Sequence, residues 1–424
     1  MSLYFYNFSA VKRAFSVRNF AIYTVGSAIS TTGMWMQRLA IGWLTWDLTE
    51  SGTWLGIVAV AEAIAVLLVT PVGGVIADRV DRRMISILAQ SFACFIACVF
   101  SSLIWLGSIT PELVILLVFL GGIAGALNQA ARITLVTNMV PRELMSTAIA
   151  TTSVIFNMSR VAGPAVAGLL IANVGIVWVF VINAVSYLIF LVSLLRLDMP
   201  RPARVKLPHQ HFLADFFEGC RYTFTSRALT VMIFLTAINA LFSRPITELL
   251  PGFIGSVFSG GPGQLATLTS CLGIGAIAAG LWLAQRGTLR GLTTVVFSAV
   301  AVNGLAIFIF SGTDLFIVAM AALLVSGFVQ GCSGTGTQTL LQATTEDRMR
   351  GRVISLWLVI GWGGPALGAL AMGVLAETLS FGTPLMIGGL ITAAATLWVM
   401  PQRRATQSLM EQTARAKSAV GTGS

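Results

Sequence analysis

Charged residues are scarce in this chain, and that scarcity excludes most soluble proteins. They make up 10% of 424 residues, whereas soluble domains carry about a quarter. Only two histidines and five scattered cysteines are present, so neither a disulfide framework nor a Cys/His metal site is expected. The phosphate-binding pattern G-x-x-x-x-G-K-[ST] is absent, which argues against direct use of ATP. We expect no cofactor, no metal and no enzymatic activity.

Apolar residues are abundant instead. They make up 56% of the chain, and the mean hydropathy is +0.87. About 20 apolar residues cross a bilayer as a helix, and twelve segments meet this length. The expected transmembrane helices cover residues 20–46, 54–76, 84–106, 113–136, 147–171, 176–195, 229–250, 265–283, 292–310, 315–341, 353–375 and 384–400.

The formal net charge of +10 reflects topology rather than nucleic-acid binding. Of the 26 Lys and Arg residues, 22 fall in loops on the side of the two termini, and the opposite loops contain none. This distribution follows the positive-inside rule. It predicts cytoplasmic termini, a multi-pass membrane protein and no nucleic-acid partner.

The chain divides into two similar halves. The longest polar stretch between spans, 196–228, separates six spans from six and holds a possible interfacial helix at 212–222. Short matches such as "GGVIADR" (73–79) with "GLWLAQR" (280–286) recur at offsets of 201 to 207. Such a parallel repeat describes a transporter of two pseudo-symmetric six-helix bundles. We expect bundles at 1–195 and 229–401, a cytoplasmic loop between them, and a disordered tail at 402–424.

The stretch "GVIADRVDRR" (74–83) resembles the loop G-x-L-A-D-R-x-G-R-R between helices two and three of the major facilitator superfamily. Ile76 and Asp81 depart from that pattern. The segments "GMWMQRLAIGWLTWDLTESG" (33–52), "VPRELMSTA" (140–148) and "RGRVISL" (350–356) resemble the bacterial branch of enterobactin-exporter-like and macrolide-efflux-like permeases. The resemblance covers about residues 15 to 400. It implies a twelve-helix transporter of the bacterial inner membrane that acts as a monomer and alternates access to a midplane site.

The same resemblance implies a conformational latch at the cytoplasmic side. Asp78 would face the positive N-terminal end of the eleventh span. This contact would form in one transport state and break in the other. The alternative is a purely topological role for this loop. The implied latch residues are Gly74, Asp78, Arg79, Arg82, Arg83, Arg350 and Arg352.

Ionisable residues inside membrane spans are costly and therefore candidates for function. Arg38 lies about 12 Å from the outer end of the first span, and Glu62 lies at a similar depth in the second. A pair between them is geometrically allowed. A carboxylate removed from water binds a proton more readily, so Glu62, with Arg38, is the candidate proton-coupling site. The alternative is an ion pair that only stabilises the bundle.

Four in-span Arg against two in-span Glu suit a cargo with carboxylate, phenolate or phosphate groups. Arg244 and Glu248, four apart, would share one face of the seventh span. The alternative role for the Asn and Gln side chains in these spans is to join helices by hydrogen bonds. The candidate substrate-cavity residues are Arg132, Arg160, Asn128, Gln129, Gln330, Gln338, Arg244 and Glu248.

The segment "RVAGPAVAG" (160–168) is similar to the superfamily's antiporter motif G-x-x-x-G-P-x-x-G-G, with Ser159 in place of the first Gly. Pro bends a helix, and glycines permit close crossing of the partner half. The packing candidates are Gly163, Pro164, Gly168 and Pro365. In the family this motif accompanies exporters.

The function expected is proton-coupled efflux of a mid-sized organic compound, such as a siderophore or a drug-like amphiphile. The alternatives are uptake of an anionic metabolite, a lipid flippase, and a non-transporting receptor or scaffold. The expected partners are the small-molecule cargo, the proton and the lipid bilayer.

Overall fold

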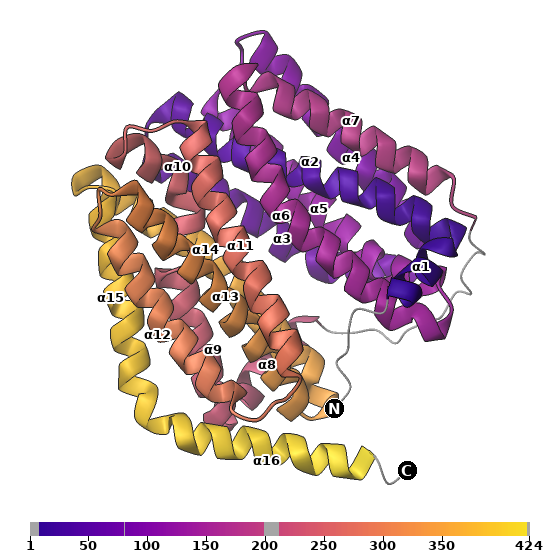
Figure 1. Cartoon of the computed structure of the whole chain (residues 1–424), viewed down its shortest axis with the longest axis vertical. Coiled ribbons are helices and arrows are strands. Elements are labelled where there is room, and N and C mark those ends of the chain that lie inside the picture. The colour runs from indigo at the N-terminus through magenta and orange to yellow at the C-terminus, as the bar shows by residue number, and fades with distance from the viewer. Residues whose placement is uncertain (1–7, 80, 199–211, 422–424) are drawn as a thin grey trace. The chain divides into compact units, whose positions relative to one another are not determined.

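The computed structural model describes residues 8–79, 81–198 and 212–421. Across these residues the secondary structure is helical (Figure 1). The α-helices are α1 (Phe8–Ser16), α2 (Arg18–Thr49), α3 (Gly52–Arg79), α4 (Arg82–Trp105), α5 (Pro111–Met139), α6 (Met145–Asn173), α7 (Val177–Leu195), α8 (Phe212–Thr225), α9 (Arg227–Phe242), α10 (Ile246–Val257), α11 (Pro262–Arg286), α12 (Leu292–Ser311), α13 (Phe316–Thr344), α14 (Asp347–Thr378), α15 (Gly382–Val399) and α16 (Arg403–Gly421).

Local sequence sets several of these helix ends. Asp81 caps α4 by accepting a hydrogen bond from the Arg83 backbone N–H at 2.9 Å, which is a standard role of Asp at a helix start. Thr110 caps α5 and is followed by Pro111, a residue suited to the first helical position. At a helix C-terminus, Gly287 adopts the left-handed conformation (φ 57°) that terminates α11.

Eleven helical stretches in the described part of the chain are long and apolar enough to cross a membrane. They match the predicted spans from the second to the twelfth. The first predicted span, 20–46, coincides with α2 and is not among the eleven. Its 32 residues exceed the length needed, but the helix is diluted by Ser, Thr, Gln and Arg. Several of those polar side chains, including Ser27, Ser30 and Thr31, are buried in the fold.

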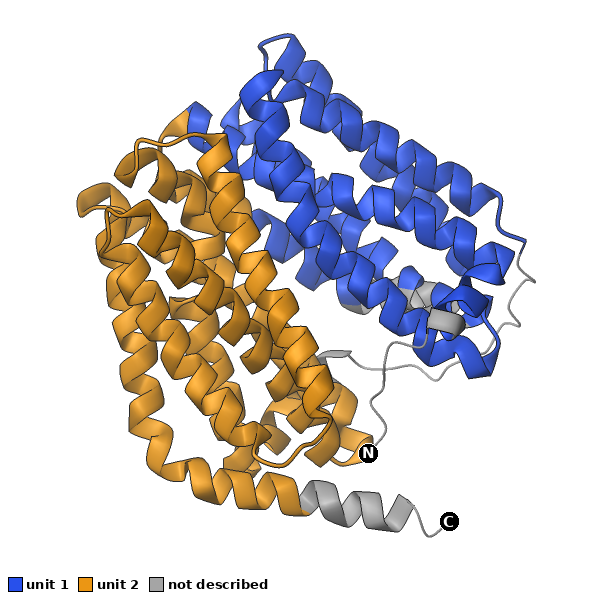
Figure 2. Cartoon of the chain, in the orientation of Figure 1, with its two compact units in different colours: residues 1–48, 61–208 blue, residues 49–60, 209–424 orange. Residues whose placement is uncertain are grey.

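The helices group into two compact units (Figure 2). Unit 1 contains residues up to 48 and 61–208, and unit 2 contains residues 49–60 and 209–424. The sequence predicts a contiguous first half, but the first turns of α3 pack with unit 2. Small residues explain this: Gly52 lies against Gly373, and Gly56 lies against Leu370 of α14.

The seventh predicted span is not one continuous helix. It breaks between α9 and α10, where Ser243, Arg244 and Pro245 form a turn. Proline carries no backbone N–H and fixes φ, so it begins α10 more readily than it continues α9. The two residues predicted to share one helical face therefore lie around this break: Arg244 is in the turn and Glu248 is in the first turn of α10.

The tail predicted to be disordered forms helix α16 instead. Its Ala, Gln, Arg and Met content favours a helix, and specific contacts hold its first half on unit 2. Met410 and Thr406 are buried. Gln407 accepts a hydrogen bond from the Thr294 hydroxyl at 3.0 Å, and Glu411 accepts one from the Gly291 backbone N–H at 2.6 Å. The amino-acid composition of the tail does not predict these tertiary contacts.

Candidate functional site

An ion pair joins α2 to α3 inside unit 1. The Arg38 guanidinium lies 2.8 Å from Glu62 Oε1, a pair that the matching depths of the two residues allowed. The side chains are 33% and 30% exposed, so the pair is accessible rather than sealed in the core. An ion pair that is exposed in this way can exchange its partners.

Trp35 extends this pair to a third helix. The Arg38 guanidinium carbon lies 5.9 Å from the centre of the Trp35 ring, and that of Arg160, on α6, lies 5.7 Å from it. Phe156 packs edge-on against the same ring at 5.9 Å. Cation–π attraction of about 0.5–2 kcal/mol per contact offsets part of the repulsion between the two cations. The structure thus brings together Arg38 and Arg160, which the sequence assigned to separate sites.

Sequence reasoning missed Trp35 as a member of this cluster. Trp35 and Arg38 are three residues apart on one helix, the spacing that places side chains on the same face. That spacing is the signal that could have found it. We call Trp35, Arg38, Glu62 and Arg160 the Trp35 cluster.

The position of α6 beside α2 depends on small residues. A Cβ added to Gly163 would overlap Trp35 Cβ and the backbone of α2. Ser159, which replaces the first glycine of the family motif, receives a hydrogen bond from the Thr32 hydroxyl at 3.0 Å. The crossing that Gly163 permits in the described contacts is therefore with α2 of the same unit. Pro164 and Gly168 are also buried in α6, within an unbroken helix.

Arg132 and Asn128 bind neighbouring helices in a separate part of unit 1. Arg132 donates to the hydroxyls of Ser27 and Thr31 on α2, and its guanidinium lies 5.5 Å from the Phe190 ring centre. Asn128 donates to Gln90 at 3.2 Å. Ser27 and Thr31 lie eight and four residues before Trp35 on α2, so Arg132 binds α2 about one to two turns before the Trp35 cluster. Gln129 is exposed on α5.

Gln330 begins a buried chain of polar side chains in unit 2. It donates to Ser326 at 2.9 Å, Ser326 donates to Asn303 at 2.7 Å, and Asn303 donates to Asn239 at 2.7 Å. The chain links α13, α12 and α9. Gln338 lies half-buried two turns further along α13. Such bonds join helices, which is the alternative role the sequence left open for these amides.

Arg244 is also engaged within unit 2. It donates to the Gly361 carbonyl of α14 at 3.1 Å. Beside this contact, Pro365 is buried inside α14, and Gly364 lies against Ala240 of α9.

The predicted latch is only partly described. Gly74 and Arg79 belong to α3, as does Asp78, but their side chains lie outside the described residues. Arg83 donates to the Leu194 and Leu195 carbonyls at 2.9 and 2.8 Å, at the end of α7. Cations at a helix C-terminus stabilise it, so Arg83 fixes the start of α4 to α7. Arg82 is half-buried in the first turn of α4.

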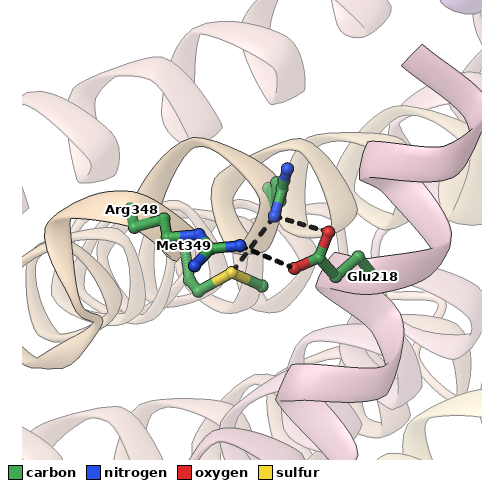
Figure 3. Close-up of polar contacts among 4 residues, drawn as sticks. Glu218, Arg348 and Met349 are labelled. Atoms are coloured by element: carbon green, nitrogen blue, oxygen red, sulfur yellow. Dashed lines mark hydrogen bonds and ion pairs between the residues drawn. The ribbon is translucent and has the colours of Figure 1, made fainter. Parts of the chain in front are cut away.

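The other two latch residues, Arg350 and Arg352, have partners inside unit 2. Arg350 lies 2.5 Å from Asp347, and Arg352 lies 2.7 Å from Glu218 of α8. Figure 3 shows Glu218 directed toward the start of α14, where Arg348 and Met349 lie. Arg348 is 3.9 Å from the same carboxylate, and Arg352 also contacts the Met349 sulfur at 3.4 Å. We call Glu218, Arg348 and Arg352 the α8–α14 clasp.

Known proteins similar to this chain are transporters. It is 27% identical over 319 residues to the enterobactin exporter EntS of Shigella flexneri, covering 73% of each chain. The match to EntS of Escherichia coli O139:H28 is 27% over 320 residues, again 73% of each.

Solved structures of low identity share the fold. The nucleoside transporter NupG superposes with a TM-score of 0.70 at 12% identity, over 91% of this chain and 98% of that one. A bacterial homologue of the human lysosomal transporter Spinster gives 0.68 at 15% identity, over 93% and 98%.

A family profile described as transmembrane secretion effector matches residues 12–418. With the apolar helices and the shared fold, this makes the chain a multi-pass transporter of the bacterial inner membrane. The chain belongs to the transmembrane secretion effector family of the major facilitator superfamily.

Proposed function

We propose that the protein is a proton-coupled exporter of a mid-sized organic compound, either a siderophore or a drug-like amphiphile. The observation that carries the proposal is the accessible Arg38–Glu62 ion pair, at 2.8 Å, beside Trp35 and Arg160. The name of its relative, the enterobactin exporter, supports efflux and a siderophore cargo.

The Trp35 cluster can exchange a proton for a cargo. Protonation of Glu62 removes its negative charge, which weakens its attraction to Arg38. An anionic group of the cargo can then bind the Arg38 and Arg160 guanidinium groups, while its apolar part packs on Trp35 and Phe156. Departure of the cargo returns Arg38 to Glu62, which favours release of the proton.

The proposal includes the topology and the latch. The long helix α2 is the first of twelve membrane spans, with its polar residues facing other helices, and both termini are cytoplasmic. The protein acts as a monomer whose two bundles alternate access to the cargo. Asp78 forms a state-dependent contact with the start of α14.

The test is transport by the full-length protein in proteoliposomes with an imposed pH gradient. The probes are enterobactin and, separately, a fluorescent bisbenzimide dye. We expect Glu62→Gln to abolish proton-coupled accumulation, because an amide cannot carry the proton. The matched control is Glu112→Gln, an exposed carboxylate at the start of α5. Retained coupling in Glu62→Gln would refute the proposal.

Uptake of an anionic metabolite is the second candidate. It is favoured by the excess of in-span arginines over glutamates in the sequence. Direction separates the two candidates: cells that lack the protein retain an exported probe, whereas they fail to accumulate an imported one.

A further inference from the structure

Glu377, near the end of α14, binds the beginning of α3. Its Oε1 atom accepts a hydrogen bond from the Ser51 hydroxyl at 2.5 Å and one from the Thr53 backbone N–H at 3.3 Å. All these groups belong to unit 2. Ser51 also accepts a hydrogen bond from the Trp54 N–H at 3.4 Å, so it caps α3 while donating to Glu377.

This arrangement is favourable for a carboxylate. The first N–H groups of a helix have no partner within the helix, and the helix dipole favours negative charge there. Glu377 therefore supplies from another helix what a capping residue usually supplies locally. Hydrogen bonds to an ionised acceptor are roughly twice as strong as neutral ones.

The backbones of α3 and α14 are in direct contact beneath Glu377. A Cβ added to Gly52 would overlap the Gly373 backbone, and one added to Gly373 would overlap Gly52. One turn later, a Cβ on Gly56 would overlap the Leu370 backbone. Leu55, 3% exposed, faces Gly252 of α10. The first two turns of α3 are thus packed against α14 and α10.

Helix α3 continues from this contact into unit 1. It runs unbroken from Gly52 to Arg79, and the boundary between the units falls between residues 60 and 61. Glu62 follows that boundary by two residues and pairs with Arg38 of unit 1. A change in how residues 51–60 sit on α14 therefore acts directly on the helix that carries Glu62.

We propose that Glu377 is a positioning residue for proton coupling: it holds residues 51–60 on α14, and release of this contact moves Glu62 away from Arg38. The inference rests on the proposed function of Glu62. It assigns to Ser51, Gly52, Gly373 and Glu377 the role of a releasable contact whose state is transmitted through α3.

The contact is tested by thiol labelling of the purified full-length protein, which requires no cargo. Leu55→Cys places a buried reporter on residues 51–60, and maleimide modification at that position is followed by mass spectrometry. In this background we expect Glu377→Ala to raise the labelling rate roughly tenfold or more, since it removes a charged hydrogen-bond acceptor. Ser51→Ala should raise it less, and Ser51→Thr, which keeps the hydroxyl, should leave it near the parental rate.

Glu112→Ala is the matched control, because Glu112 is an exposed carboxylate at the start of a helix of unit 1. It should leave the labelling rate unchanged. Equal rates in the parental protein and in both Glu377→Ala and Ser51→Ala would overturn the contact. A control that matches Glu377→Ala would do the same, since the effect would then not be specific.

The link to Glu62 is tested by a double-mutant cycle on the same reporter. Glu62→Gln alone should raise labelling, because it weakens the pair that opposes release. Combined with Glu377→Ala, the two effects on the labelling rate should multiply, as expected for distant contacts that break in one transition. A labelling rate that Glu62→Gln leaves unchanged would overturn the transmission through α3. Failure of Glu62→Gln to abolish proton coupling in proteoliposomes would refute the proposed function alone, since the labelling assay reports no transport.

Discussion

The two units solve the same packing problem with different chemistry. In unit 1, α2 is tied to its neighbours by Arg132 and by the Arg38–Glu62 ion pair. In unit 2, the corresponding first helix of the repeat, α9, is tied to α12 and α13 by neutral groups, Asn239, Asn303 and Ser326. Both arrangements give polar side chains partners on neighbouring helices.

The difference teaches where chemistry can occur. A neutral amide chain changes neither charge nor partner with pH, so it gives a constant connection between helices. A carboxylate–guanidinium pair changes its interaction whenever the carboxylate gains a proton. Under the proposed proton coupling, the pair in unit 1 is the one whose interaction changes with pH, whereas the buried chain of unit 2 keeps its interactions.

The short helices that precede the two halves of the repeat differ in the same way. Helix α1 precedes α2 and packs on η1 (Arg142–Leu144) and α6, where Ala14 and Ala148 are fully buried in one apolar cluster. Helix α8 precedes the seventh span and packs on α14 through the α8–α14 clasp. At the repeat offset of 204, Ala148 corresponds to Arg352. An apolar contact in unit 1 thus has an ionic counterpart in unit 2.

The largest effect should come from breaking the ion pair of unit 1. We expect Arg38→Ala to lower the free energy of unfolding by about 2 kcal/mol, because Glu62 loses its guanidinium partner; the exposure of the pair keeps this below the cost of a sealed pair. Chemical denaturation of the purified protein measures it. The double variant Arg38→Ala/Glu62→Ala should recover part of the loss, and no recovery would contradict the pairing.

An intermediate effect is expected for the neutral chain of unit 2. Asn303→Leu removes two buried hydrogen bonds, and bonds of this kind in membrane proteins average about 0.6 kcal/mol. The expected loss is about 1–2 kcal/mol, measured in the same assay. The pH dependence of transport should not change. Val302→Leu, at an exposed neighbouring position, is the control; an altered pH dependence in Asn303→Leu would remove the distinction between the units.

The smallest effect should come from the α8–α14 clasp. Its side chains are 45% exposed at Glu218 and 82% at Arg348, and exposed pairs contribute about 0–1 kcal/mol. We expect high salt or Glu218→Gln to loosen α8, whereas α1 should be insensitive to salt. Hydrogen exchange of the two helices makes the comparison, and equal salt sensitivity would contradict it.

The alkylation rate of the Cys220 thiol gives a second measurement of the α8–α14 clasp. Burial raises the pKa of the Cys220 thiol on α8, so little thiolate forms near neutral pH and alkylation is slow. Detachment of α8 should return the pKa toward its ordinary value and speed alkylation. The rate should therefore rise in Glu218→Gln, and an unchanged rate would place α8 beyond the influence of the clasp.

Most of the helices and the Arg38–Glu62 pair were predictable from the sequence. Span positions follow from runs of apolar residues, and the pair follows from matching depths on neighbouring helices. The break at Pro245 carried a local signal, since proline interrupts helical hydrogen bonding. The helix propensity of residues 403–421 was a local signal for α16. The burial of Met410 and the Glu411–Gly291 hydrogen bond, however, depend on residues far away in the chain.

Other features had no local signal. Nothing adjacent to Arg352 indicates that its partner is Glu218, 134 positions earlier. Arg160 was assignable to a span, but its placement on the Trp35 ring depends on the close crossing of α6 and α2 at Gly163.

The sequence by itself determined the environment of this protein, the extent of its membrane helices and its family, because those depend on composition, periodicity and short motifs read along the chain. Apart from the Arg38–Glu62 pair, the tertiary structure alone decided which polar groups meet. The partners of Arg352, Arg160 and Glu377 come from helices distant in sequence, and only the packing of small residues at the crossings brings those helices close enough to bond.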